Sequence, residues 1–381
     1  GRWFESTPRY HKMQINKKIF QNIFKIISYS LFKIFYKKIE KIANQKNNNE
    51  IRVSNIKKNG NFEYQIYTIN KGRLYTDRVN DTAVISKNEI VENASFQYRV
   101  ENSKVFNADI KKNIVFSKGT PRLQKKINGS VLSLLTGGGG NDNYWHWLFD
   151  VLPRLALCQE IINLEKINYF LLPNNKKKFQ KETLEILKIS ENKQISSENY
   201  RHILCDKLFV TSHPVARSND VTKDVQNIPL WISQWLKSTF MKGNGKKFAK
   251  KIYIDRSDST SNVKHLRTIK NEDEVKNYLS EIGFENVKLG EYSFADQISI
   301  FENAEIIVGL HGAGFANIVF SKPNVKIIEL KKRSHQGKEI ENLAKSNNLS
   351  YKYLKFDSLD THENQFGHIN VSINELKKNI D

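Results

Sequence analysis

The chain has 381 residues and a mass of 44.4 kDa, which is too long for one ordinary hydrophobic core and predicts two domains of roughly 150 residues each. With 39% hydrophobic residues, 22 Phe and 15 Tyr, the composition excludes a disordered chain. The formal charge of +21 is uneven, because residues 1–60 contain fourteen Lys or Arg and three Glu, a surplus of 14 minus 3, or +11. The remainder is spread thinly, which favours a lysine-rich soluble surface over a nucleic-acid patch.

The first predicted element is a helix from Ile19 to Ile42, where apolar residues recur at helical spacing with lysines between them. Lys25 and Lys33 interrupt it too often for a membrane-spanning helix, which needs about 20 predominantly apolar residues. We therefore predict a basic amphipathic helix on an anionic membrane surface, with a helix packed on the protein's own core as the alternative. The polar run Asn44–Glu50 predicts a linker.

Residues 51–135 predict short strands, because β-branched and aromatic residues form runs between turn-forming residues. These runs are Glu63–Thr68, Thr82–Ile85, Phe96–Val100 and Asn113–Phe116. From residue 140 on, strand and helix patterns alternate, which predicts α/β layers with parallel pairing. The first set is a strand at Tyr169–Leu172, a helix at Phe179–Ile189, a strand at Lys207–Thr211 and a helix at Pro229–Phe240.

After an interruption at Met241–Lys250, a second alternating set predicts a Rossmann-like domain. Its strands are Ile252–Ile254, Asn286–Leu289, Glu305–Val308 and Val325–Leu330, and its helices are Asn271–Ile282 and Ser293–Asn303. We therefore divide the chain into residues 1–50, an amino-terminal helix and linker, residues 51–245, an α/β domain, and residues 246–381, a Rossmann-like domain.

The two cysteines, Cys158 and Cys205, exclude a disulfide framework and lie in no cluster with metal-ligand spacing. A reducing compartment fits this composition. The chain also lacks the Gly-x-Ser-x-Gly, His-Glu-x-x-His and Asp-x-Asp motifs, which weighs against a hydrolase and against a metal–diphosphate site.

The most distinctive motif is Glu305–Asn317, in which an apolar strand runs into a turn containing His311, Gly312 and Gly314. A helix is predicted to begin at about Phe315. Glycines let the backbone approach a ligand, and the free N–H groups of a first helical turn favour a phosphate. The glycine spacing is neither the dinucleotide fingerprint nor a P-loop. We predict an anion site in which His311 donates to a phosphate oxygen, and a glycine turn without a ligand is the alternative.

A second motif runs from Gly137 to Arg154, where four glycines precede an aromatic segment and predict a mobile loop or lid. If a helix begins at about Asn143, His146 and Asp150 share one face, with Arg154 one turn further on. Asp150 can then orient His146 as a general base, and Arg154 can hold an anion. The alternative is a buried His–Asp pair in a Trp-rich core.

Two strand ends provide further candidates. Arg256 follows a predicted strand and points to the crevice where α/β proteins bind ligands, so it is a candidate phosphate clamp, with a surface ion pair as the alternative. Glu329 ends another strand and could accept ribose hydroxyls, or it could face water or pair with a lysine.

Taken in order, these motifs resemble glycosyltransferase family 61, in its bacterial capsule and lipopolysaccharide branch. The resemblance covers roughly Leu135 to Tyr353 and rests on Asn143–Arg154, Tyr253–Arg256, Arg267 with Asn271–Glu272, Phe294–Ile298, Ala304–Asn317 and Ile327–Leu330. It implies a GT-B arrangement, two Rossmann-like domains facing across a cleft, and inverting transfer from a nucleotide sugar without a metal. Phe315 departs from the family's usual Leu and Asp255 from its frequent Ser.

The resemblance also implies a set of site residues, of which Gln297 and Asn317 depend on it alone. The set is His146, Asp150, Arg154, Arg256, Arg267, Gln297, His311, Gly312, Gly314, Asn317 and Glu329. His146 is the expected base, oriented by Asp150, with Asp150 itself as second choice. Glu329 is expected on the ribose, and Arg256, His311 and the start of the helix at residues 312–317 on the departing diphosphate.

We therefore expect an inverting glycosyltransferase of surface polysaccharide synthesis, with residues 51–245 on the acceptor side and residues 246–381 binding the donor. The expected partners are a nucleotide sugar, a glycan or lipid-linked acceptor and an anionic membrane surface, with no nucleic acid, no metal and no cofactor. The expected location is cytoplasmic, peripheral on the membrane face. The alternatives are a non-catalytic nucleotide-sugar or anion-binding module, which would tolerate His146→Ala, and a basic nucleic-acid-binding protein, whose affinity would fall steeply with salt.

Overall fold

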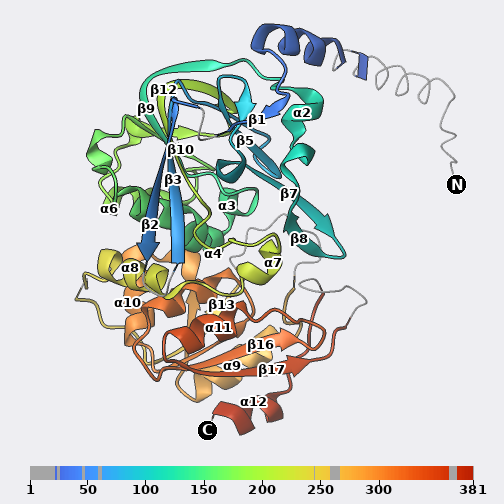
Figure 1. Cartoon of the computed structure of the whole chain (residues 1–381). Helices are drawn as coiled ribbons and strands as arrows, with labels where there is room; N and C mark the ends of the chain where they lie inside the picture. Colours follow the sequence, from blue (N-terminus) through green and yellow to red (C-terminus); the bar gives the residue numbers. More distant parts are fainter. Residues whose placement is uncertain are drawn as a thin grey trace, which may run out of the picture.

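The computed structural model in Figure 1 describes residues 22–23, 26–44, 48–58, 62–243, 245–257, 267–359 and 367–380. Within these residues the chain forms a 12-stranded sheet from its amino-terminal half and a 5-stranded sheet from its carboxyl-terminal half. Helices pack on both sheets, and the carboxyl-terminal sheet lies below the other in Figure 1. The predicted α/β class is confirmed, while the GT-B arrangement remains a prediction.

The amino-terminal sheet combines an antiparallel part with a parallel part. The antiparallel strands are β2 (Ile51–Lys58), β3 (Phe62–Asn70), β4 (Arg73–Thr76), β5 (Asp81–Ser86), β6 (Glu89–Ile90), β7 (Phe96–Glu101) and β8 (Lys104–Asn107), with the short β1 (Lys41–Ile42) parallel to β6. The parallel strands are β9 (Lys125–Ser133), β10 (Tyr169–Leu172), β11 (Gln194–Ser196) and β12 (His202–Thr211). Because β12 also pairs antiparallel with β3 and β4, it joins the two parts into one sheet.

The helices of this half alternate with its strands along the chain from residue 114 on. They are α2 (Ile114–Lys118), α3 (Gly139–Asp142), α4 (Tyr144–His146), the π-helical turn η4 (Trp147–Val151), α5 (Pro153–Cys158), α6 (Lys178–Ile186), α7 (Val221–Asp224) and α8 (Leu230–Phe240). Short 3-10 turns lie at Glu92–Ala94, Ile110–Lys112, Leu164–Lys166 and Glu191–Lys193. Both cysteines, one on α5 and one on β12, are unpaired and buried.

The carboxyl-terminal sheet is entirely parallel, in the order β14-β13-β15-β16-β17. Its strands are β13 (Lys251–Asp255), β14 (Glu285–Lys288), β15 (Ile306–Leu310), β16 (Lys326–Lys332) and β17 (Ser350–Phe356). Its helices are α9 (Glu272–Glu281), α10 (Phe294–Asn303), the 3-10 helix η8 (Ala313–Phe320), α11 (Glu339–Ser346) and α12 (Ile373–Ile380), with a 3-10 turn at Leu289–Glu291. The direction in which strands are added reverses between β13 and β15, and in α/β sheets ligands bind outside the carboxyl ends of the strands at such a reversal.

Two hydrophobic cores cover the faces of this sheet. Along β13, Tyr253 packs with α9 and α12, whereas Ile252 and Ile254 pack with α10, η8 and α11. The second of these cores continues without a break into the amino-terminal half, where Trp147 and Leu155 belong to it. The two halves therefore meet through packed helices, and residues on α4 and on η8 keep a defined relative position.

Most predicted elements between residues 140 and 330 are present, including the helix at Pro229–Phe240 and a strand at each predicted strand position. β12 extends five residues further towards the amino terminus than the predicted strand at Lys207–Thr211. The strand predicted at Asn113–Phe116 is wrong, because residues 114–118 form α2. There Asn113 caps the helix by accepting from the Val115 N–H, and Asp81 accepts from the Ile114 N–H, so tertiary hydrogen bonds override the β-branched sequence.

The predicted amino-terminal helix is found in part. Residues 26–36 are helical, whereas residues 19–21 and 24–25 lie outside the described residues, as do residues 45–47 of the predicted linker. The helix ends before Ile42 because Lys37 adopts a φ of 60°, Ile39 is buried and Lys41–Ile42 pairs with β6 as a strand. In the described part of the chain, no helix is both long and apolar enough to cross a membrane.

Candidate active site

The predicted pairing of His146 with Asp150 is present. Asn143 starts the short helix α4 by accepting from the N–H groups of Trp145 and His146. The π-helical turn that follows keeps both side chains on one face, and His146 Nδ1 lies 2.5 Å from Asp150 Oδ2. With Nδ1 bonded to the carboxylate, Nε2 is the nitrogen of neutral His146 that can accept a proton.

The charges around this pair favour an ionised carboxylate. Burial raises the pKa of Asp150, but the charges of His146 and Arg154 and the His146 hydrogen bond outweigh it and lower the pKa. For His146, burial lowers the pKa, and the charge and hydrogen bond of Asp150 outweigh that effect and raise it. The His146 side chain is 30% exposed while Asp150 is 4% exposed, so the imidazole is the member of the pair that solvent and substrate can reach.

Arg154 lies one turn after Asp150, as the helical spacing predicts, but its guanidinium, predicted to hold an anion, bonds protein groups. Its Nε donates to the carbonyl oxygen of Asp150, and its Nη1 donates to the carbonyl oxygen and hydroxyl of Thr211. Burial lowers the pKa of Arg154 to about 10. The guanidinium thus ties the π-helical turn to β12, one turn from the His146–Asp150 pair.

The glycines before this helix form a packed turn rather than an open loop. Gly139 and Gly140 begin α3, and a Cβ at Gly139 would lie 2.6 Å from His146 Cδ2. A Cβ at Gly140 would lie 2.5 Å from Thr136 Cγ2. The absence of side chains here lets the turn pack directly against the imidazole and fix its position.

We expect Gly139→Ala to displace the His146 ring and to lower the proposed catalytic rate about tenfold or more, since a misplaced catalytic group costs that much or more. Gly138→Ala is the matched control, because its Cβ would meet nothing closer than Val79 Cγ1 at 3.3 Å. Steady-state rates and melting temperatures of both variants measure the effect. Equal rates for the two variants would show that the turn does not position His146.

The carboxyl ends of β13 and β15 bring two arginines to one carbonyl group. Arg256 Nη1 and Arg267 Nε each donate to the carbonyl oxygen of His311, both at 2.6 Å. Gly312 permits this approach, because a Cβ there would lie 3.0 Å from Arg256 Cζ. Burial lowers the pKa of Arg267 to about 9, and the nearby charge of Arg256 contributes in the same direction. Two guanidinium groups held this close favour an anion beside them.

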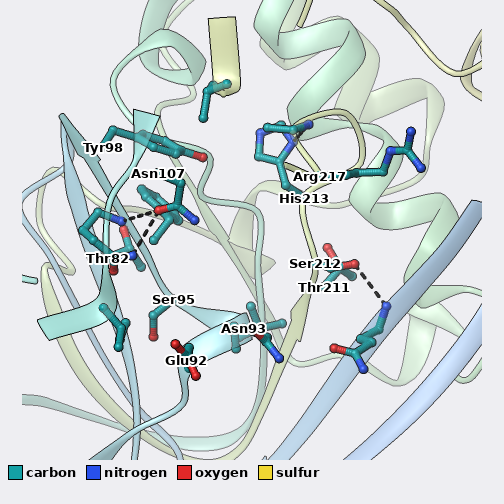
Figure 2. Close-up of a pocket in the computed structure, with 18 of the residues that line it drawn as sticks. Thr82, Glu92, Asn93, Ser95, Tyr98, Asn107, Thr211, Ser212, His213 and Arg217 are labelled. Atoms are coloured by element: carbon teal, nitrogen blue, oxygen red, sulfur yellow. Dashed lines mark hydrogen bonds between the residues drawn. The ribbon is translucent and has the colours of Figure 1, made fainter. Parts of the chain in front are cut away.

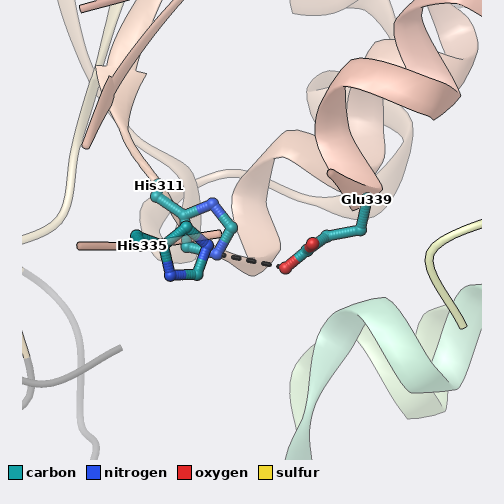
Figure 3. Close-up of side chains that lie close together, drawn as sticks. All are labelled: His311, His335 and Glu339. Carbon is teal, nitrogen blue, oxygen red and sulfur yellow. Dashed lines mark ion pairs between the residues drawn. The ribbon is translucent and has the colours of Figure 1, made fainter. Parts of the chain in front are cut away.

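His311 and Glu329 form a buried pair behind these arginines. His311 Nδ1 bonds Glu329 Oε1, and His311 Nε2 lies 3.3 Å from Glu339 Oε1 (Figure 3). The second oxygen of Glu329 accepts from the hydroxyl of Tyr351 and lies 3.4 Å from Lys331 Nζ. In this structure Glu329, 1% exposed, therefore contacts protein groups, and both ring nitrogens of His311 face carboxylates. Their predicted contacts with ribose and phosphate remain predictions.

His311, His335 and Glu339 offer three potential metal ligands whose atoms all lie within 4.8 Å of one another (Figure 3). Zn²⁺ binds such atoms at about 2.0–2.2 Å, so the cluster would have to contract to hold it. The charge of Arg267 contributes to lowering the pKa of His335, and the charge of Glu339 acts to raise the pKa of Arg267. With the arginines and Lys331 around it, the cluster suits an anion better than a cation.

A chain of buried hydrogen bonds joins the two halves at η8. The hydroxyl of Tyr144 donates to Asn317 Oδ1, Asn317 Nδ2 donates to Gln297 Oε1, and Gln297 Nε2 donates to the carbonyl oxygen of Leu289. Gln297 and Asn317 thus connect α4 to Leu289, directly after β14. The 3-10 helix begins at Ala313, two residues before the predicted start at Phe315. Gly314 lets it pack on Leu289, because a Cβ there would lie 2.8 Å from Leu289 Cδ1.

A polar cavity of about 720 Å³ lies in the amino-terminal half, and neither His146 nor Asp150 is among the residues that line it. Tyr98 and Asn107 line one side of it, and His213 and Arg217 line the other (Figure 2). Arg154 also lines it, and the charge of Asp150 acts on the pKa values of Tyr98 and His213. The sequence analysis missed this cavity, because its lining comes from segments that are far apart in the chain.

His213 is held neutral at the cavity wall. Its Nδ1 accepts from the N–H groups of Val215 and Ala216, so Nε2 donates to the hydroxyl of Thr136. Burial is the main cause that lowers the pKa of His213 to about 3. Residues 226–227 follow the lining segment without lining the cavity, and they accept hydrogen bonds from Asn342 of α11.

Comparison with known proteins finds a family model that matches part of the chain, including most residues of this site. Residues 144–328 match the family model described as Glycosyltransferase 61. A β-1,2-xylosyltransferase from Arabidopsis thaliana is 36% identical over 70 residues, which are 18% of this chain and 13% of that protein. The crystal structure of the bacterial iron-containing dodecameric glycosyltransferase TibC from enterotoxigenic E. coli aligns with 86% of both chains, at 10% identity and a TM-score of 0.31.

Proposed function

We propose that this protein, whose residues 144–328 match the Glycosyltransferase 61 family model, transfers a sugar from a nucleotide sugar to a hydroxyl group of a glycan acceptor. The observation that supports this most directly is that a histidine–carboxylate pair and a pair of arginines lie at two elements that a hydrogen bond joins. The Tyr144–Asn317 hydrogen bond joins the helix of His146 to η8, whose start lies beside Arg256. A base and a leaving-group site are the two parts that such a transfer requires.

In the proposed reaction, His146 Nε2 takes the proton of the acceptor hydroxyl as that oxygen attacks the anomeric carbon. The bond from the anomeric carbon to the phosphate oxygen breaks on the opposite face, and the nucleoside diphosphate leaves with the electron pair. The configuration at the anomeric carbon is thereby inverted. Asp150 holds the imidazole in the required tautomer and stabilises the imidazolium that forms.

The donor diphosphate is proposed to bind Arg256, Arg267 and the N–H groups at the start of η8. The two guanidinium groups would neutralise the charge that develops on the leaving group, so no metal ion is needed for this step. The Glu329–His311 pair would then fix the residue that follows β15, and the carbonyl oxygen of this residue accepts hydrogen bonds from both arginines. We also propose that His311 leaves Glu339 when the donor binds and contacts a phosphate or the ribose instead.

The acceptor is proposed to occupy the polar cavity of the amino-terminal half. Hydroxyl, amide and guanidinium groups line it, as suits a ligand rich in hydroxyl groups. Asn107, Gln97 and Ser212 are examples of side chains that could bond sugar hydroxyls. We further propose a GT-B arrangement and a role in surface polysaccharide synthesis, in which the acceptor is a growing or lipid-linked glycan.

A thermal-shift screen of UDP, GDP, CMP and TDP, each with and without EDTA, tests the donor site. A nucleotide at 100 times its dissociation constant should stabilise the protein by about 2.7 kcal/mol, which is enough to raise the melting temperature. We expect one nucleotide to do so and EDTA to leave the shift unchanged. A shift that EDTA removes would contradict the metal-independent transfer, and the absence of any shift would contradict the nucleotide-sugar donor.

A further inference from the structure

The helix of residues 26–36 packs on the protein with one face only. On that face Tyr36 accepts from the N–H of Gln124 and stacks edge-on against His202, while Lys33 Nζ donates to the carbonyl oxygen of Ser117. Gly119 also contacts the Lys33 side chain, which places the helix beside the end of α2 (Figure 1). The aromatic and lysine side chains of this face therefore fix how the helix is rotated about its axis.

The opposite face is aliphatic and exposed. Its large side chains are 50–75% exposed and comprise Ile26, Ile27, Leu31, Ile34 and Phe35, with Ile23 on the turn before them. Helix geometry places these residues within one half of the helix circumference. Eight other large apolar side chains are exposed in the described residues, but they are scattered over the remaining length of the chain. Apolar side chains gathered on one exposed face mark an interaction surface.

Basic residues surround the carboxyl end of this helix. Lys37 is exposed, and the following residues line a surface pocket of about 550 Å³. The pocket contains Lys38, Lys41 and Lys87 with Asn44, Asn48 and Asn88, and also Glu40 and Glu89. Lys38 pairs with Glu40 at 3.1 Å. Lys37 and the three lysines of the pocket outnumber its two glutamates, so the net charge of this region is +2. An aliphatic face next to an excess of lysine complements the interface of an anionic bilayer, where acyl chains lie just below phosphate groups.

We propose that this protein docks on an anionic lipid bilayer through the aliphatic face of residues 26–36, with the pocket of Lys38, Lys41 and Lys87 at the lipid phosphates. The helix lies parallel to the membrane surface, because its inner face remains packed on the protein. Docking would keep the rest of the protein outside the bilayer and hold a lipid-linked acceptor near it. The docking surface itself is independent of the transfer chemistry.

Flotation of the full chain with vesicles tests this proposal. Vesicles of phosphatidylcholine and phosphatidylglycerol in equal parts are compared with vesicles of phosphatidylcholine alone. We expect wild type to bind the anionic vesicles. The double variant Ile27→Glu with Ile34→Glu should bind about tenfold or more weakly. The triple variant Lys37→Gln, Lys38→Gln and Lys41→Gln should also bind more weakly, and its binding should depend less on salt.

Val100→Glu with Leu230→Glu is the matched control, because these side chains, on β7 and α8, are 68% and 47% exposed and lie outside the helix of residues 26–36. We expect this control to bind vesicles like wild type. Failure of wild type to bind anionic vesicles, or equal binding by all variants, would overturn the proposal. So would a dimer that Ile27→Glu with Ile34→Glu dissociates without any vesicle binding, since a second copy would then cover this face. Nucleotide thermal shifts of the same variants separate loss of docking from failure of the proposed donor site.

Discussion

Replacing His146 by alanine is expected to lower kcat for sugar transfer about 100- to 10,000-fold, the usual contribution of a general base. The acceptor hydroxyl would have to lose its proton to water, whereas the donor site at the end of β13 would be intact. We therefore expect the nucleotide thermal shift to remain that of wild type. Initial rates with saturating donor, together with the melting temperature, measure the two effects separately.

The pH dependence of kcat gives a second test of the same residue. Asp150 raises the pKa of His146 above its ordinary value, and the base must be neutral to accept a proton. The rate should therefore rise with pH through a pKa above 6.5. Asp150→Asn removes the negative charge and should move this rise to lower pH while lowering the maximal rate.

His368→Ala is the control for His146→Ala, because His368 is another partly buried histidine, bonded to the hydroxyl of Thr268 and outside the His146–Asp150 pair. It should leave the pH profile unchanged. If His146→Ala transferred sugar at the wild-type rate, Asp150 would become the candidate base. If Asp150→Asn were also fully active, neither member of the pair would be the base.

Replacing Arg256 by alanine is expected to weaken nucleotide binding about 10- to 100-fold. A hydrogen bond to a charged group contributes about 1.5–3 kcal/mol, and about 1.4 kcal/mol corresponds to a factor of ten. Arg256 also donates to the carbonyl oxygen of His311, but Arg267 donates to the same oxygen and can retain that contact. Titration calorimetry with the nucleotide found in the thermal-shift screen measures the affinity directly.

Arg256→Lys is the informative comparison, because it keeps the charge and removes the planar fork of donors. We expect its affinity to lie between those of wild type and Arg256→Ala. Arg333→Ala is the matched control, since Arg333 is exposed and pairs with Asp357 on the surface. Wild-type affinity in Arg256→Ala would contradict the assignment of the diphosphate to the crevice between β13 and β15. An equal loss in Arg333→Ala would show that overall charge, rather than this site, governs binding.

The sequence by itself determined the features that depend on neighbouring residues. Strand and helix periodicity predicted most strands and helices between residues 140 and 330, because burial repeats every two residues along a strand and every three to four along a helix, but β11, α7 and the elements after residue 332 were not predicted. A spacing of four predicted the His146–Asp150 contact, and the end of an apolar strand predicted that Arg256 lies at the crevice. The same periodicity predicted an amphipathic helix near the amino terminus, although not where it ends.

The tertiary structure alone decided which distant residues meet. Arg256 and Arg267 both donate to the carbonyl oxygen of His311 because β13 and β15 are neighbours in the sheet. The order of strands in a sheet cannot be read from the order of residues along the chain. Glu329 is a partner of His311 and Tyr351 because its strand β16 lies between β15, which leads into His311, and β17, which carries Tyr351. Arg154 bonds Thr211 because β12 packs against its helix. The polar cavity and the outward face of residues 26–36 likewise depend on contacts between remote segments. Local propensity and spacing are properties of adjacent residues, whereas these contacts follow from packing that minimises exposed apolar surface and satisfies buried polar groups across the whole chain.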